Sequence, residues 1–202
     1  YGTPKAAPLW SQLQFAPLQW SVAQLSEQER QQMEALPLTL RLPEAPGLFF
    51  AHASERDDHD TVAAYTPEEQ LHGMFPAAPE PYLIRAHNHY GQVRVWQNRL
   101  IVTCGSVGLP LDSHPTAQYL LLDQQANGWK IQHMAVPYPL EATLKRFHDT
   151  GYLEAVGPMA RLFYREVLTA SHQIVPCLRL YAQWSSQESI TFPQAVERFI
   201  SL

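Results

Sequence analysis

The alternation of apolar and polar residues along the middle of the chain predicts several β-strands. Leu48–Ala51 is a continuous apolar run, which is typical of a buried strand, and residues 82–86 have the same strand character. Residues 38–42 alternate with a period of two, which predicts a strand with one buried face. Two hairpins are also predicted, one from residues 93–96 and 100–104 and one from residues 119–123 and 129–136.

Capping signals predict two helices ahead of these strands. Ser21 is followed three residues later by Gln24, so we expect a helix to start at Ser21. Ser26 and Glu29 repeat the pattern for a second helix, and Pro37 ends it because proline cannot continue the helical hydrogen bonding.

Helical patterns recur later in the chain. A short helix is expected at residues 67–74, inside a polar and proline-punctuated surface excursion. Beyond Pro139, apolar residues recur at helical spacing. Residues 139–202 are therefore expected to form a helical extension packed on the same domain.

Composition indicates a folded protein of one compact domain. The chain has 202 residues, of which 46% are hydrophobic and 16% charged, and this balance excludes a disordered chain. No apolar run approaches the roughly 20 residues that cross a membrane. The sequence lacks an initiator Met and begins in a proline-rich stretch, so we expect an amino-terminal part to be missing.

Charge and cysteine content narrow the function classes. The formal net charge is −5, and the Lys and Arg residues are scattered, which argues against binding of nucleic acid through a basic surface. Cys104 and Cys177 lie far apart, so neither a disulfide framework nor a cysteine zinc site is indicated. No secretory signal is visible in the first residues, and we expect a cytoplasmic protein without a membrane partner.

His87 and His89 are the first candidate metal ligands. In an extended segment, residues two apart point to the same side, so both imidazoles would reach one site. Imidazole is a ligand that suits Zn, Mn, Fe and Ni. The alternative is that a His-x-His tripeptide arises by chance in a chain with 9 His.

His52 is the third candidate ligand. It follows the buried strand 48–51 and precedes two small residues, Ala53 and Ser54, which would let a ligand approach. A histidine at a strand end can equally be a structural or surface residue, and its context has to decide.

A glycine turn follows the predicted strand 100–104. Gly105 and Gly108, with Ser106 between them, could turn the backbone sharply and offer N–H groups to an anion. The alternative is an ordinary tight turn between strands.

The order of these segments resembles the calcineurin-like metallophosphoesterases, in particular their small bacterial phosphodiesterase and phosphatase branch. A tryptophan-led helix that ends in Leu-Pro matches residues 20–37, and a strand that closes in a metal-binding histidine matches residues 48–54. The family's Gly-His-Thr-His motif is similar to residues 86–89, and its Gly-Ser-Val-Gly-x-Pro block is similar to residues 105–110. The likeness runs from about Trp20 to Tyr138.

This resemblance implies a fold, a cofactor and a ligand set. The fold would be a four-layer α-β-β-α sandwich, with residues 1–138 as the carboxy-terminal portion of the metallophosphoesterase domain. Two divalent transition-metal ions (Mn, Fe, Zn or Ni) would serve hydrolysis of a small phosphoester, as in a phosphatase or phosphodiesterase. His52 and His87 would hold one ion and His89 the other. Asn88, Gly105 and Ser106 would be the substrate-binding residues.

The chain also departs from the family pattern. Ala86 and Asn88 replace the usual Gly and Thr of the histidine motif. The family's Asp-x-His, Gly-Asp and Gly-Asn-His motifs would precede Tyr1, so the catalytic residues are unknown and are expected in an absent amino-terminal part. That part, or a second copy of the chain, is the expected protein partner.

Two alternatives from other functional classes remain open. One is a non-catalytic binding or regulatory module that retains the phosphoesterase scaffold. The other is an enzyme of a different fold that holds a single metal ion with His52, His87 and His89. A metal content of one ion per chain would favour the second alternative.

Overall fold

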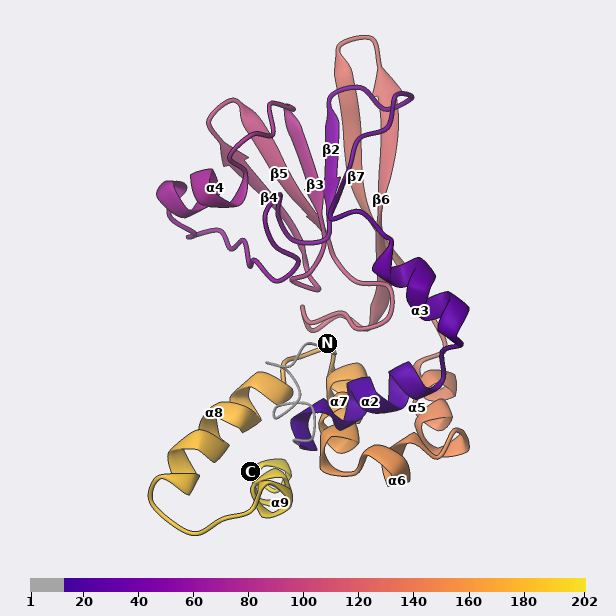
Figure 1. The fold of residues 1–202 in the computed structure, drawn as a ribbon, viewed down its shortest axis with the longest axis vertical. Coiled ribbons are helices and arrows are strands. Elements are labelled where there is room, and N and C mark those ends of the chain that lie inside the picture. Colours follow the sequence, from indigo (N-terminus) through magenta and orange to yellow (C-terminus); the bar gives the residue numbers. More distant parts are fainter. Residues whose placement is uncertain (1–12) are drawn as a thin grey trace. The chain divides into compact units, whose positions relative to one another are not determined.

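The computed structural model describes residues 13–202 and forms two compact units (Figure 1). Leu36–Tyr138 make up a β-rich unit, which we call the sheet unit. Residues 13–35 and Pro139–Leu202 make up a helical unit. The helices before residue 36 thus belong with the helical tail, and the packing of that tail on the sheet domain stays a prediction.

Five strands of the sheet unit form one mixed sheet in the order β1-β2-β3-β5-β4 (Figure 1). Strand β3 is parallel to both of its neighbours, β2 and β5, whereas the outer strands β1 and β4 are antiparallel to theirs. The bounds of these strands are Thr39–Leu40 (β1), Leu48–Ala51 (β2), Tyr82–Arg85 (β3), Gly91–Trp96 (β4) and Arg99–Cys104 (β5).

The two faces of this sheet pack against different elements. On one face, Phe49, Leu83 and Ile101 contact Leu71 and neighbouring side chains of α4 (Glu68–Met74). On the opposite face, the sheet packs against an antiparallel hairpin of β6 (Thr116–Gln125) and β7 (Gly128–Pro137). A helix, a sheet and a hairpin therefore lie on one another, while the complete four-layer sandwich stays a prediction.

Most predicted strands are confirmed. Strand β2 has its predicted bounds, and β3 and both hairpins lie where the apolar pattern indicated. The predicted strand at 38–42 is shortened to Thr39–Leu40, and its expected buried face is wrong because Leu38 and Leu40 are 42% and 45% exposed. The physical reason is that β1 is an edge strand, hydrogen-bonded only to β2.

The helical tail is also confirmed, and it shares a core with the helices before the sheet unit. Trp20 of α2 packs with Leu162 of α7, Cys177 of α8 and Val196 of α9 in one cluster of apolar side chains. The bounds of the elements in this unit are Leu13–Phe15 (η1), Ala16–Ala23 (α2), Glu27–Glu34 (α3), Leu140–Asp149 (α5), Tyr152–Val156 (α6), Pro158–Thr169 (α7), Ile174–Ser185 (α8) and Phe192–Ile200 (α9). Within residues 13–202, no helix has the length and apolar character needed to span a membrane.

The two capping predictions had different outcomes. The Ser26–Glu29 capping box is present at the start of α3, with both of its reciprocal hydrogen bonds. The predicted helix start at Ser21 is wrong, because α2 already begins at Ala16 and Ser21 donates from its hydroxyl to the carbonyl of Pro17. Proline at the first turn favours that earlier start.

Glu166 generates a stability prediction for the helical unit. Its side chain is 3% exposed, and one carboxylate oxygen accepts hydrogen bonds from the backbone N–H groups of Gln173 (2.9 Å) and Ile174 (3.0 Å), where α8 begins. Glu166→Leu removes this acceptor and is expected to lower the free energy of unfolding by about 2–3 kcal/mol. Glu166→Gln keeps an acceptor oxygen and should lose less. Urea unfolding followed by circular dichroism tests this, and equal losses for the two variants would contradict it.

Gly105 generates a second prediction because its backbone has a φ of +87°. A Cβ atom at this position would lie 2.1 Å from the amide oxygen of Gln118 and 2.9 Å from its Cβ. Gly105→Ala is therefore expected to destabilise the sheet unit by about 2–4 kcal/mol, through both backbone strain and overlap. Gly108→Ala is the matched control, since a Cβ there meets nothing within 4 Å. Thermal unfolding should separate the variants, and an unchanged midpoint for Gly105→Ala would refute the prediction.

Candidate metal site

Three strand ends bring the candidate residues to one edge of the sheet. Because β2, β3 and β5 are parallel, their carboxyl ends meet at the same edge. His52 directly follows β2, His87 lies two residues beyond β3, and Gly105 directly follows β5. The backbone N–H of Ala86 donates to the carbonyl of His52 at 2.9 Å, which joins the first two loops.

His52 and His87 converge, as predicted. The Nε2 atom of His52 lies 3.4 Å from the Nδ1 atom of His87, and the ring centroids are 5.4 Å apart. With metal–nitrogen bonds of about 2.0–2.1 Å, two nitrogens on one ion are typically about 3–3.5 Å apart. The geometry suits a shared ion, and metal binding by this pair stays a prediction.

His89 is oriented by the turn that follows β5. Its Nδ1 atom lies 2.8 Å from the carbonyl oxygen of Leu109, so Nδ1 carries the hydrogen and donates it. The backbone N–H of Leu111 donates to the carbonyl of His89 at 3.0 Å. The turn therefore lies beside His89, as expected, and leaves the Nε2 lone pair free to act as a ligand.

The reason for expecting His87 and His89 on the same side is wrong. Both residues have positive φ angles, 67° for His87 and 62° for His89, so the segment is not extended. Between them, the N–H of Asn88 bonds to the carbonyl of Ala86 at 2.9 Å and bends the chain. The approach of His87 to His52 thus arises from a strained loop, not from alternation along a strand.

Electrostatics favour neutral imidazoles at His52 and His87. Partial burial lowers the pKa of both histidines from the ordinary value of 6.5, and the positive charge of Arg85 lowers each further. The carboxylate of Asp58 acts in the opposite direction on the pKa of His52. Around neutral pH both rings are therefore unprotonated and have a lone pair available for a metal ion.

The side chain of Asn88 is engaged within the protein. It is 8% exposed; its oxygen accepts from Arg85, and its nitrogen donates to the carbonyl of Val62 (2.8 Å) and the hydroxyl of Tyr90 (2.9 Å). Ser106 accepts a hydrogen bond from the N–H of Leu109 at 3.0 Å. The substrate-binding roles expected for Asn88, Gly105 and Ser106 stay predictions.

Asp57, Asp58 and His59 were missed in the sequence, although they follow His52 by only a few residues. One potential ligand atom from each lies within 4.8 Å of the others, and all three side chains are exposed. The ring of His59 lies 6.1 Å from that of His87. The adjacent Asp-Asp-His sequence was the available signal. Exposed acidic groups of this kind are common without an ion, so this group carries no assignment.

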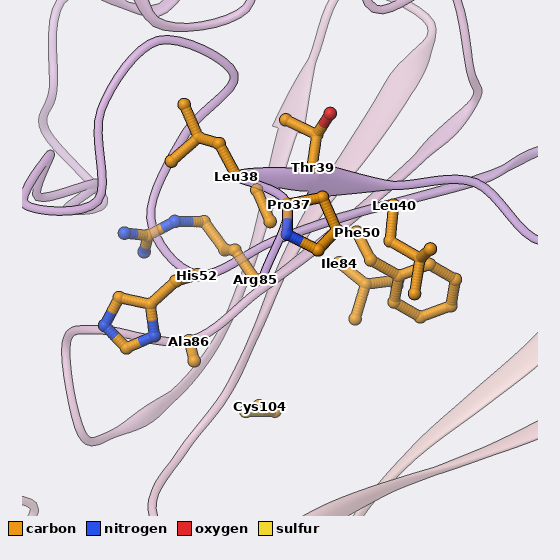
Figure 2. Close-up of a pocket in the computed structure, with 11 residues that line it drawn as sticks. Pro37, Leu38, Thr39, Leu40, Phe50, His52, Ile84, Arg85, Ala86 and Cys104 are labelled. Carbon is orange, nitrogen blue, oxygen red and sulfur yellow. The ribbon is translucent and has the colours of Figure 1, made fainter. Parts of the chain in front are cut away.

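A cavity of about 280 Å³ lies beside His52 (Figure 2). His52 and Arg85 lie toward one end of it, while Leu40 and Phe50 lie toward the other. The cavity lining comes from residues 37–40 and from β2, β3 and β5 with the residues that follow β2 and β3. Of the two histidines of the pair, His52 lines this cavity.

Two of the three histidines can share one transition-metal ion, because His89 does not join His52 and His87 in a described group whose ligand atoms all lie within 4.8 Å of one another. His52 and His87 offer two converging nitrogens, and His89 has a hydrogen-bonded ring with its second nitrogen free. Such imidazoles suit Zn, Mn, Fe or Ni better than Mg or Ca. These three rings do not by themselves supply a ligand that bridges two ions.

Comparisons with known proteins support the fold. No protein-family model matches the sequence, and no curated protein matches it significantly. The crystal structure of a metallophosphoesterase from Sphaerobacter thermophilus is similar, with a TM-score of 0.57, 20% identity, and coverage of 75% of this chain and 64% of that chain. The crystal structure of a hypothetical protein from Pyrococcus horikoshii OT3 is also similar, with a TM-score of 0.60, 19% identity, and coverage of 79% of this chain and 65% of that chain.

These likenesses define the class of fold. At 19–20% identity they show that the chain has a mixed α/β fold resembling that of a metallophosphoesterase. The chain spans less than two thirds of the length of either protein.

The histidine pair generates a prediction about metal binding. His52→Ala and His87→Ala should each weaken Zn²⁺ binding at least about 10-fold, because each removes one of the two converging nitrogens. His114→Ala is the control, since that ring is exposed and its Nδ1 lies 2.9 Å from the carbonyl of Asp112. Isothermal titration calorimetry measures the affinities. If all three variants bind as the unmodified chain does, the pair is not a metal site.

Proposed function

We propose that this chain is part of a metal-dependent phosphoester hydrolase, acting as a phosphodiesterase or phosphatase. The observation that carries the proposal is the 3.4 Å approach of His52 to His87 at the ends of two parallel strands. The similarity of the fold to that of a metallophosphoesterase also supports the proposal. Each observation rests on different information, since one concerns side-chain donors and the other the path of the backbone.

Under this proposal, each histidine has a distinct task. His52 and His87 hold one divalent ion, and His89 presents its free nitrogen to a second ion beside it. The ions, when bound, orient the phosphate, lower the pKa of a bound water and stabilise the charge that develops on the oxygens. Gly105 and Ser106 begin the turn that holds His89, so a phosphate held there would lie close to backbone N–H groups.

Hydrolysis of bis(p-nitrophenyl) phosphate and p-nitrophenyl phosphate tests the proposal. The complete protein is expected to hydrolyse these substrates in the presence of Mn²⁺, Zn²⁺, Ni²⁺ or Fe²⁺. Hydrolysis should cease after exhaustive chelation and return when the ion is restored. His52→Ala should reduce the rate at least about 100-fold, since ion and nucleophile are lost together. His114→Ala is the matched control and should keep the rate. Undiminished hydrolysis after chelation would refute the proposal.

The donor set also favours a second candidate, a site with a single metal ion. His52 and His87 converge on one position, and the described imidazoles do not include a bridging ligand. Metal analysis of the purified chain separates the two candidates. Two ions per chain support the dinuclear hydrolase, and one ion supports the single-metal site.

A further inference from the structure

Arg85, the last residue of β3, is the most deeply buried charged side chain near the histidines. It is 2% exposed, and burial lowers its pKa to about 10, so the guanidinium remains charged at neutral pH. None of the ion pairs among the described residues includes it. A buried cation held only by neutral acceptors is unfavourable unless its hydrogen bonds are well satisfied.

Arg85 makes four such hydrogen bonds, and their acceptors belong to three segments: the loop after β2, the loop after β3, and β5. Nε donates to the carbonyl of Ala53 (2.6 Å), and one terminal nitrogen donates to the carbonyl of Asp60 (2.7 Å). The other terminal nitrogen donates to the side chains of Asn88 (2.7 Å) and Thr103 (3.1 Å). Only the planar fork of arginine presents donors in so many fixed directions.

The partners of Arg85 are the neighbours of the candidate ligands. Ala53 directly follows His52, and Asn88 lies between His87 and His89. Thr103 lies at the end of β5, and its carbonyl oxygen is 2.8 Å from Nε2 of His133. One side chain therefore connects both histidine-bearing loops with the strand that precedes the glycine turn.

The loop that contains Asn88 has a conformation that needs such support. A positive φ at a non-glycine residue is unfavourable, and this loop has two, at His87 and His89. The buried amide of Asn88 makes three hydrogen bonds. Those with Arg85 and with the carbonyl of Val62 both lead to the loop after β2, which carries His52.

We infer that Arg85 is a positioning residue of the candidate metal site. Its guanidinium fixes the loop after β2, which carries His52, relative to the loop after β3, which carries His87 and His89. The approach of the two ring nitrogens depends on this connection, together with the backbone hydrogen bond from Ala86 to His52 and the bond from Asn88 to Val62. The inference rests on the proposed function only where it concerns metal binding.

The first measurement uses the metal-free chain. Arg85→Met keeps an unbranched, buried apolar side chain and removes all of the donors, so the contact between the His52 and His87 rings should be lost from nuclear Overhauser spectra. Arg85→Lys keeps the charge but not the fork, so it should restore the contact only in part. Thr103→Val removes a single acceptor and should have the smallest effect.

The second measurement uses Co²⁺ as the probe. Arg85→Met should weaken Co²⁺ binding about 10- to 100-fold, as expected when a group that orients metal ligands is removed. The visible absorption spectrum of bound Co²⁺ should also change, because the ligand geometry changes. A loss of stability alone would not alter that spectrum in the folded protein.

Arg99→Met is the matched control. Arg99 donates to the carbonyl of Ala78 (2.6 Å) and to Gln97 (3.1 Å), and its guanidinium lies 3.9 Å from the ring centroid of Trp96. It opens β5, so it lies at the strand end opposite to Thr103. Arg99→Met should lower thermal stability while leaving the histidine contact and the Co²⁺ spectrum unchanged.

The outcomes separate this inference from the proposed function. If the unmodified chain binds no Co²⁺, the proposed metal site fails, and the ring contact alone decides the role of Arg85. If Arg85→Met folds and keeps both the ring contact and the Co²⁺ spectrum, the positioning role is refuted. If Arg85→Met does not fold, Arg85→Lys decides, and an unperturbed ring contact in that variant refutes the inference.

Discussion

The parallel pairing of β2 with β3 and of β3 with β5 is the constraint on which the candidate site depends. Register pairs such as Phe50 with Ile84 and Arg85 with Thr103 bring the three carboxyl ends level. An antiparallel β3 would have placed His87 at the opposite edge from His52. Because both faces of the sheet are covered, a slip of one residue would exchange the two apolar faces, and the register is strongly specified.

The sequence predicted this arrangement where packing and local pattern agree. Strand β2 is a continuous apolar run, which indicates burial on both faces, and His52 follows it directly. The approach of His52 to His87 at neighbouring strand ends could therefore be predicted from the sequence. Strand β1 shows where the pattern fails, because its alternation indicated a buried face that an edge strand does not have.

The conformation of the histidine loop could not be predicted from the sequence. Positive φ angles at His87 and His89 contradict the local preferences of these residues, and they arise from tertiary contacts of Asn88. The burial of Arg85 was not predicted from the sequence either. Its burial follows from four acceptors that lie up to 32 positions away in the chain, and no local window contains them.

The side-chain amide of Asn88 makes three hydrogen bonds that a threonine at this position could not all make. The metallophosphoesterases that the sequence resembles have threonine at the position of Asn88, and threonine has no amide to accept from a guanidinium and also donate to two oxygens. The pair of Arg85 with Asn88 therefore holds the loop after β3 through contacts that need an amide. Proteins that share one fold can catalyse different reactions, so a shared topology alone does not establish a function. What ties the proposed chemistry to this chain is local and independent of the fold comparison: two imidazole nitrogens 3.4 Å apart, held by loops that one buried guanidinium joins.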